Sequence, residues 1–297
     1  MPEITPFLWF DDQAESAMTF YTSIFDDSGI GHVERYPDES LDPHFAGMTG
    51  KVISGSFRLL GRSFLCLDGG PLFTINPSIS FYATLEDHAK IEATWQRLGE
   101  GGAVLMPLQA YPWSPAYGWL QDRYGVSWQL TLAGPDRPAA RVMPQLMFTG
   151  PAAGRAQEAM RLYTGLFEAS GIDALVPYEE GDQDTAGLVK HARFHLGDNH
   201  FLAMDSTRGH DFTFNEGVSL FVSCRDQAEV DRYWDALTCG GGVESQCGWL
   251  KDPFGVSWQI VPANLPELLA AGPDVLQAFM AMRRIDIAEL HRVGRGG

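Results

Sequence analysis

The stretch DRYGVSWQL at residues 122–130 returns as DPFGVSWQI at residues 252–260. Two other pairs of blocks recur in the same order. They are AMTFYTSIF (17–25) with AMRLYTGLF (159–167), and NPSISFYATLED (76–87) with NEGVSLFVSCRD (215–226). Self-similarity over such a long period indicates that one structural unit occurs twice. The unit is about 130 residues long.

The repeat divides the chain into four parts. We expect a first domain at 1–133, a linker at 134–141, a second domain at 142–264 and a C-terminal helical extension at 265–297. The stretch AGPDRPAAR around the linker has the Pro and Gly content of a connecting segment. In the extension, Pro266 and Pro273 mark helix starts, and we expect its apolar stripe to pack across both domains.

The composition indicates a globular, acidic protein. The 297 residues include 21 Lys and Arg against 38 Asp and Glu, a net charge of −17, and 45% are hydrophobic. Such a charge repels phosphate backbones and anionic lipid, so we expect no nucleic-acid or membrane partner. The start MPEITPFLWF lacks the features of a signal peptide, which favours a cytoplasmic location. The spacing of the four cysteines is typical of free thiols.

Hydrophobic periodicity alternates between the strand and the helix period within each repeat. In the first repeat the pattern predicts a strand at 4–10, a helix at 12–26 and strands at 31–37, 51–60 and 62–68. It then predicts a strand at 78–85, a helix at 87–99 and strands at 103–106, 117–121 and 126–132. Each repeat therefore consists of two βαβββ modules, which is an α+β fold.

Paired βαβββ modules with a DxxGxxWQ motif resemble the vicinal oxygen chelate superfamily, the glyoxalase and bleomycin-resistance fold. Residues 143–290, which include GGGVESQCGWLKDPFGVSWQIVP (240–262), closely resemble its PhnB-like branch, and residues 1–133 resemble it less closely. The resemblance implies a tandem form in which eight strands curl into a cup, with helices outside and the ligand inside. Two alternatives stay open: modules could pair within or between repeats, and the chain could be a monomeric pseudo-dimer or a homodimer.

Catalytic members of the superfamily generally hold a divalent metal on the first strand, on the strand that opens the second module and on the last strand. The resemblance places these positions at Pro6 and Pro144, at Ser80 and Ser219, and at Gln129 and Gln259. Proline cannot coordinate through its side chain, serine is a poor ligand and one amide does not hold an ion. We therefore expect no metal and no other cofactor.

A second set of metal-ligand candidates is His191, His195 and His200. In a strand, His191 and His195 share a face but lie about 13 Å apart, so they cannot share one ion. His195 and His200 flank a hairpin turn without an obvious carboxylate ligand. We interpret all three as exposed hairpin histidines.

Strand alternation also predicts the lining of the cups. If the apolar residues of the strands face the helices, then their polar neighbours face the concave side. The candidate ligand-binding residues are Arg58, Ser80, Gln129, Arg193, His195, Ser219 and Gln259. Hydrogen-bonding groups in an apolar, aromatic cavity are typical of a small-ligand site.

These observations favour a metal-free protein that binds an unidentified small molecule. Two alternatives remain, namely an enzyme of this fold (an isomerase, lyase or dioxygenase) and a structural or interaction module. PhnB-like sequences often carry the label demethylubiquinone methyltransferase. A nucleotide-type cofactor would need a Gly-rich turn from a strand into a helix. The cluster GEGGAV (99–104) instead follows a helix and leads into a strand, so we do not expect methyl transfer.

Overall fold

The computed structural model describes residues 3–37, 46–134 and 141–296. The first repeat contains β1 (Ile4–Phe10), α1 (Ala14–Thr22), β2 (Gly29–Arg35), β3 (Val52–Leu59) and β4 (Arg62–Asp68). Its second module contains β5 (Ile79–Leu85), α2 (His88–Gly99), β6 (Ala103–Tyr111), β7 (Ser114–Gln121) and β8 (Ser127–Leu132). Both predicted βαβββ modules are confirmed, and β6 is longer than the pattern indicates. Most of the predicted linker, residues 135–140, lies outside the described residues.

The second repeat has the same order of elements. Its first module contains β9 (Arg141–Phe148), a 3-10 turn (Gly150–Ala152), α3 (Ala156–Leu166), β10 (Gly171–Pro177), β11 (Val189–Leu196) and β12 (Asn199–Asp205). Its second contains β13 (Val218–Cys224), α4 (Gln227–Thr238), β14 (Val243–Glu244), β15 (Trp249–Lys251) and β16 (Ser257–Pro262). The C-terminal helices are α5 (Leu265–Leu269), α6 (Pro273–Ala281) and α7 (Ile287–Gly296).

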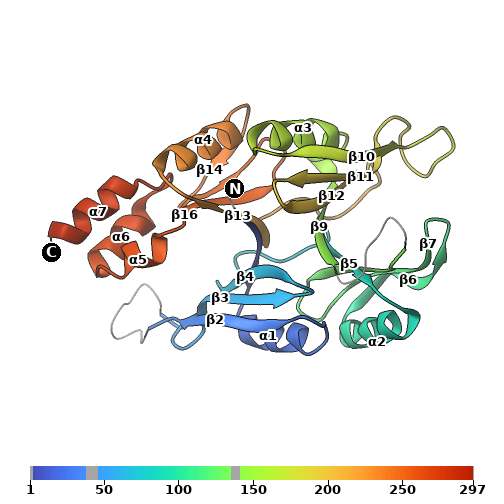
Figure 1. Ribbon diagram of the computed structural model, residues 1–297, viewed down its shortest axis with the longest axis horizontal. Helices are drawn as coiled ribbons and strands as arrows, with labels where there is room; N and C mark the ends of the chain where they lie inside the picture. Colours follow the sequence, from blue (N-terminus) through green and yellow to red (C-terminus); the bar gives the residue numbers. More distant parts are fainter. Residues whose placement is uncertain (1–2, 38–45, 135–140, 297) are drawn as a thin grey trace.

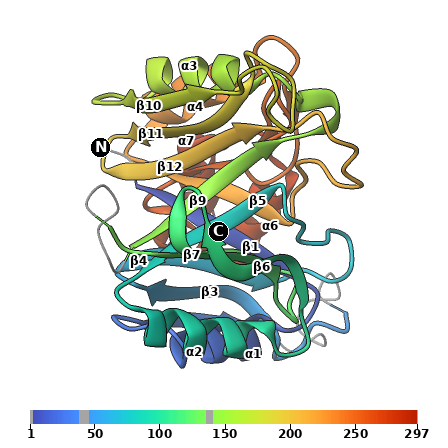
Figure 2. The same ribbon diagram turned by 90° about the vertical axis from the view of Figure 1, so that its right-hand side faces the viewer.

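The strands form two eight-stranded sheets, and each sheet combines modules of both repeats. Sheet A has the order β14-β15-β16-β13-β1-β4-β3-β2, and sheet B has the order β10-β11-β12-β9-β5-β8-β7-β6. The joining pairs are antiparallel, with Phe7 opposite Ser219 between β1 and β13, and Ser80 opposite Gln145 between β5 and β9. Sheet A lies on the left of Figure 1, and sheet B faces the viewer in Figure 2. The modules therefore pair between repeats, and one chain forms a pseudo-dimer.

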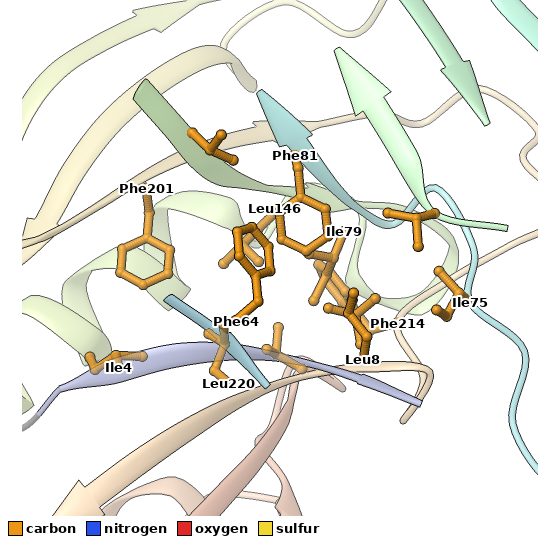
Figure 3. Close-up of a cluster of buried hydrophobic side chains, with 14 of the residues drawn as sticks. Ile4, Leu8, Phe64, Ile75, Ile79, Phe81, Leu146, Phe201, Phe214 and Leu220 are labelled. Carbon is orange, nitrogen blue, oxygen red and sulfur yellow. The ribbon is translucent and has the colours of Figure 1, made fainter. Parts of the chain in front are cut away.

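The main hydrophobic core lies between the two sheets (Figure 3). Leu8 and Leu220 from sheet A and Phe81 and Leu146 from sheet B belong to this cluster and are almost fully buried. Helices α1 to α4 pack on the same face of the sheets, α1 on β3 and α3 on β11, for example. The opposite face of each sheet carries the alternate residues of the strands. We call it the cup face, because it is the ligand side of the cup that the fold implies.

The DxxGxxWQ motif links the two sheets through a buried aspartate. Asp252 Oδ1 accepts hydrogen bonds from the backbone N–H groups of Phe254 and Val256, at 2.9 and 3.1 Å. Its Oδ2 accepts from the Tyr163 hydroxyl of α3 and from Trp258 Nε1 of β16. The equivalent set in the first repeat is Asp122 with Tyr124, Val126, Tyr21 and Trp128. Each copy of the motif thus supplies one carboxylate that accepts hydrogen bonds from four donors, namely two backbone N–H groups, a tyrosine hydroxyl and an indole N–H. This shared role explains why the motif recurs in both repeats.

Burial gives Asp252 a pH-dependent effect on stability. Burial raises the pKa of this carboxyl to about 6, although the hydrogen bonds from Tyr163 and Trp258 lower it. An unfolded aspartate has a pKa of about 3.9. The stability that this carboxyl contributes is therefore fully present below about pH 4 and is lost as the pH rises through about 6.

We expect Asp252→Asn, which removes this titration, to destabilise the protein by about 1 kcal/mol more at about pH 5.5 than at about pH 7.5. Urea unfolding of both proteins at the two pH values measures the difference. A loss that is equal at both values, or larger at the higher one, would contradict the raised pKa.

The C-terminal helices cover part of the cup face of sheet A (Figure 1). They form a second hydrophobic cluster in which Leu268 and Val275 meet Val261 of β16 and Phe221 of β13. Cys247 and Gly248 also donate backbone hydrogen bonds to the segment after α6. These contacts run to β13, to β16 and to the turn before β15, all in the second repeat. Of the helices in the described residues, none is long and apolar enough to span a membrane.

Candidate functional site

A buried glutamine and a buried serine form a pair on each cup face. In sheet A, Gln259 Nε2 donates to Ser219 Oγ at 2.9 Å, across the parallel strands β16 and β13. In sheet B, Gln129 Nε2 donates to Ser80 Oγ at 2.9 Å, across β8 and β5. All four side chains are at most 5% exposed. The structure thus brings together these four candidate residues as two equivalent pairs.

The residues that β1 and β9 present to the cups are not Pro6 and Pro144, the positions that the resemblance implies. Pro6 lies opposite Leu220 and Pro144 opposite Phe81, both of which belong to the core between the sheets. The cup-facing neighbours of Ser219 and Ser80 are instead Phe7 and Gln145.

Gln145 is a functional candidate that the sequence analysis missed. It is 5% exposed, and its Nε2 contacts Met204 Sδ at 3.0 Å. The buried apolar residues Val142, Leu146 and Phe148 show which face of β9 is the core face. Its neighbours on the cup face, Met143 and Met147, are also apolar and buried, so the sequence pattern of β9 does not distinguish the two faces.

The cup faces do not fit the divalent metal of catalytic superfamily members. The groups at the implied ligand positions are an amide and a hydroxyl that are hydrogen-bonded to each other. Within residues 3–37, 46–134 and 141–296, no three His, Cys, Asp or Glu side chains are arranged to hold a metal ion. A transition metal prefers imidazole, thiolate or carboxylate donors, and this donor set offers none of them.

The two cup faces differ in how far their polar groups are satisfied. In sheet B, the Tyr117 hydroxyl donates to Gln129 Oε1 and Trp119 Nε1 donates to Ser127 Oγ, both at 2.7 Å. In sheet A, no described residue donates a hydrogen bond to the equivalent Gln259 Oε1. The equivalent Ser257 Oγ is shielded from solvent and also has no partner among the described residues.

A single sequence difference accounts for the free carbonyl of Gln259. YGWLQD (117–122) aligns with CGWLKD (247–252), so Cys247 occupies the position of Tyr117. Cys247 has a φ of 58°, and its Sγ lies 3.9 Å from the Met280 carbonyl oxygen of α6. The thiol therefore points to the C-terminal helices. Burial raises its pKa to about 11, which argues against a nucleophile.

Four aromatic side chains lie beside this polar group on sheet A. The ring centroids of Phe7 and Trp249 are 5.7 Å apart, those of Trp9 and Trp249 6.0 Å, and those of Trp9 and Phe73 4.9 Å. Trp249 lies directly opposite Gln259 in the pairing of β15 with β16. Phe7 is 8% exposed and the other three are half-buried. We call Phe7, Trp9, Phe73 and Trp249 the aromatic cluster.

The charged candidates lie elsewhere on the sheets. Arg58 is exposed and pairs with Asp27 at 2.9 Å. His195 Nδ1 lies 2.8 Å from Asp173 Oδ1, and Arg193 Nε lies 3.8 Å from the same carboxylate. The strand order separates β3 from β16 and β11 from β8 by four strand spacings, roughly 19 Å. The charged and the amide candidates therefore do not form one site.

One of the three predicted hairpin histidines, His195, has a partner that the sequence did not indicate. Asp173 on β10 supplies the carboxylate for His195, although the two residues lie on different strands. The rings of His195 and His200 are 6.0 Å apart.

The glycine cluster GEGGAV forms a turn from a helix into a strand. It lies between the end of α2 and the start of β6, and Gly101 has a φ of 73°. A Cβ on Gly102 would lie 2.3 Å from the Gln121 carbonyl oxygen. Chain geometry therefore explains these glycines without a bound nucleotide.

Comparisons with known proteins agree with this fold. A family model described as 3-demethylubiquinone-9 3-methyltransferase matches residues 2–131 and 140–261. The PhnB protein from Bacillus cereus is 46% identical over 43% of this chain and 98% of its own, with a TM-score of 0.40. A protein from Staphylococcus aureus is 35% identical over 44% of this chain and 97% of its own, with a TM-score of 0.19. A search of curated proteins finds no match.

Glyoxalase I from Zea mays shows the likeness over both repeats. It is 12% identical, with coverage of 86% of this chain and 92% of its own and a TM-score of 0.56. At this identity the likeness shows a shared fold only. The family model matches both repeats and most of the chain. The chain therefore belongs to the 3-demethylubiquinone-9 3-methyltransferase family, the PhnB-like branch of the vicinal oxygen chelate superfamily, in a tandem form.

Proposed function

We propose that the protein binds a small organic molecule on the cup face of sheet A and uses no transition metal to do so. The unpartnered Gln259 Oε1 beside the aromatic cluster carries this proposal. Gln259 is only 5% exposed, but its Oε1 is not shielded from solvent, so a ligand or a water molecule can supply the missing hydrogen bond. In sheet B, the equivalent carbonyl of Gln129 already accepts a hydrogen bond from the Tyr117 hydroxyl.

The surroundings of Gln259 define the chemistry of the ligand. The carbonyl accepts a hydrogen bond, so the ligand carries an N–H or O–H donor. The half-buried rings of Trp9, Phe73 and Trp249 favour a flat aromatic or apolar body beside that donor. This combination of an apolar wall with a few polar groups is typical of small-molecule sites.

The two cups are not equivalent in this proposal. The polar groups of sheet B already satisfy each other through Tyr117 and Trp119. A ligand there would have to break those hydrogen bonds, whereas in sheet A it gains new ones. We therefore propose that each chain binds one ligand, on the cup face of sheet A.

A thermal-shift screen of aromatic compounds with an N–H or O–H donor tests the proposal. We expect some compounds to raise the melting temperature of the wild type but not of Gln259→Leu, which lacks the carbonyl. Gln129→Leu is the matched control, because it makes the same change on sheet B, and it should keep the response. Compounds that stabilise Gln259→Leu as much as the wild type would contradict the site.

A further inference from the structure

A cavity of about 730 Å³ lies at the seam between the two sheets, away from Gln259 and the aromatic cluster. The starts of β1 and β9 and the hairpin turns β3–β4 and β11–β12 form its wall. Its charged and titratable lining residues are Glu3, Arg62, Arg141, Asp173, His195, Asp198 and His200. Because each repeat supplies part of this lining, the cavity exists only in the paired arrangement of the two repeats.

Arg62 forms no ion pair with a carboxylate of the described residues, although Glu3 is close enough to act on its charge. Its Nη1 and Nη2 make long contacts, at 3.4 Å to the His200 carbonyl oxygen and 3.5 Å to the Ile4 carbonyl oxygen, and its Cζ lies 5.6 Å from the centre of the Phe201 ring. Its Nε is shielded from solvent and has no hydrogen-bond partner among the described residues. Burial lowers the pKa of the guanidinium to about 10, although the charge of Glu3 raises it. Arg62 is half-buried, and a partly desolvated cation is costly unless it is paired.

Further basic groups converge on the same cavity. Arg141 is exposed and forms no ion pair with any described residue. Burial lowers the pKa of His200, and Arg141, His195 and Arg62 lower it further, whereas Asp173 raises it. Arg62, Arg141, His195 and His200 all line this cavity.

No carboxylate of the lining forms an ion pair with either arginine, and Glu3 acts on Arg62 only at longer range. Asp173 is held by His195 at 2.8 Å and by Arg193 at 3.8 Å. Glu3 and Asp198 are exposed and form no ion pair with the described residues. The guanidinium groups of Arg62 and Arg141 thus remain available to an anion from outside the chain.

We propose that this cavity binds a small molecule through a phosphate or carboxylate group, which pairs with the guanidinium groups of Arg62 and Arg141. Arginine presents parallel N–H donors that match both kinds of oxyanion. The volume exceeds that of the anionic group alone and leaves space for an attached organic part. The site is independent of Gln259, so either proposal can fail without the other.

Isothermal titration with inorganic phosphate and with succinate, at constant ionic strength, tests the site on the full chain. We expect at least one anion to bind the wild type, and Arg62→Met to weaken that binding about tenfold or more. Arg141→Gln should weaken it by a smaller factor. Arg161→Gln is the charge-matched control, because Arg161 is exposed on α3 and does not line the cavity, and it should bind as the wild type does.

Thermal melting shows whether the Arg62→Met variant is still folded. Arg62→Met removes an unpaired charge and keeps the length of the side chain, so we expect no loss of melting temperature without anion. The wild type should gain melting temperature with phosphate or succinate, and Arg62→Met should not. The proposal is overturned if neither anion binds the wild type more strongly than chloride, or if Arg62→Met binds as tightly as Arg161→Gln does.

Discussion

Asp252→Ala is expected to lower the free energy of unfolding by about 4 kcal/mol. The substitution leaves four buried donors without their acceptor: two backbone N–H groups, the Tyr163 hydroxyl and the Trp258 indole. Because Tyr163 packs on sheet B and Trp258 belongs to sheet A, the loss also weakens the link between the sheets. Urea denaturation followed by circular dichroism measures the change.

Asp87→Ala provides the matched control for this effect. Asp87 caps α2 with one hydrogen bond, from the Lys90 backbone N–H at 2.8 Å, and the contact is exposed. The loss of such a cap costs about 1 kcal/mol. A loss for Asp252→Ala no larger than that of Asp87→Ala would show that the motif does not hold the sheets together.

Trp249→Ala is expected to weaken the binding of a screened aromatic compound by a factor of about 30 or more. The indole lies opposite Gln259 and packs edge-on against Phe7 and Trp9, so its removal deletes the wall of the proposed site. Burial of roughly 100 Å² of apolar surface against it contributes about 2.5 kcal/mol. Fluorescence titration or calorimetry measures the affinity.

Trp119→Ala makes the equivalent change on sheet B, where the indole donates to Ser127. It should leave the affinity within about twofold of the wild type, because sheet B does not hold the ligand in this account. Equal losses for the two tryptophan variants would mean that binding depends on general stability rather than on the cup of sheet A.

The module structure was predictable because it depends on local pattern. Each strand and helix carries its own periodicity, and the DxxGxxWQ copies fix the end of each repeat. The position of Gln129 and Gln259 on the cup faces followed from the same alternation. The exchange of modules between repeats was not predictable. Equivalent modules have similar sequences, so pairing within a repeat and pairing between repeats would use similar contacts.

The error at Pro6 and Pro144 has a related cause. Strands β1 and β9 are buried on both faces over most of their length, so no polar alternation distinguishes one face from the other. The partner of His195 and the cavity around Arg62 depend on residues distant in the sequence, Asp173 and the β11–β12 hairpin. Only the assembled sheets bring these groups together. The alignment of Tyr117 with Cys247 would indicate the free carbonyl of Gln259, but only once the structure shows that the Tyr117 hydroxyl donates to Gln129 Oε1.

A crystal structure of the protein with a compound from the thermal-shift screen would locate the ligand directly. We expect the compound on the cup face of sheet A, against Trp249, with a donor within hydrogen-bond distance of Gln259 Oε1. We also expect no metal ion bound to Gln259 and Ser219. A compound bound to Gln129 on sheet B, or a metal ion coordinated by Gln259, would contradict the proposed site.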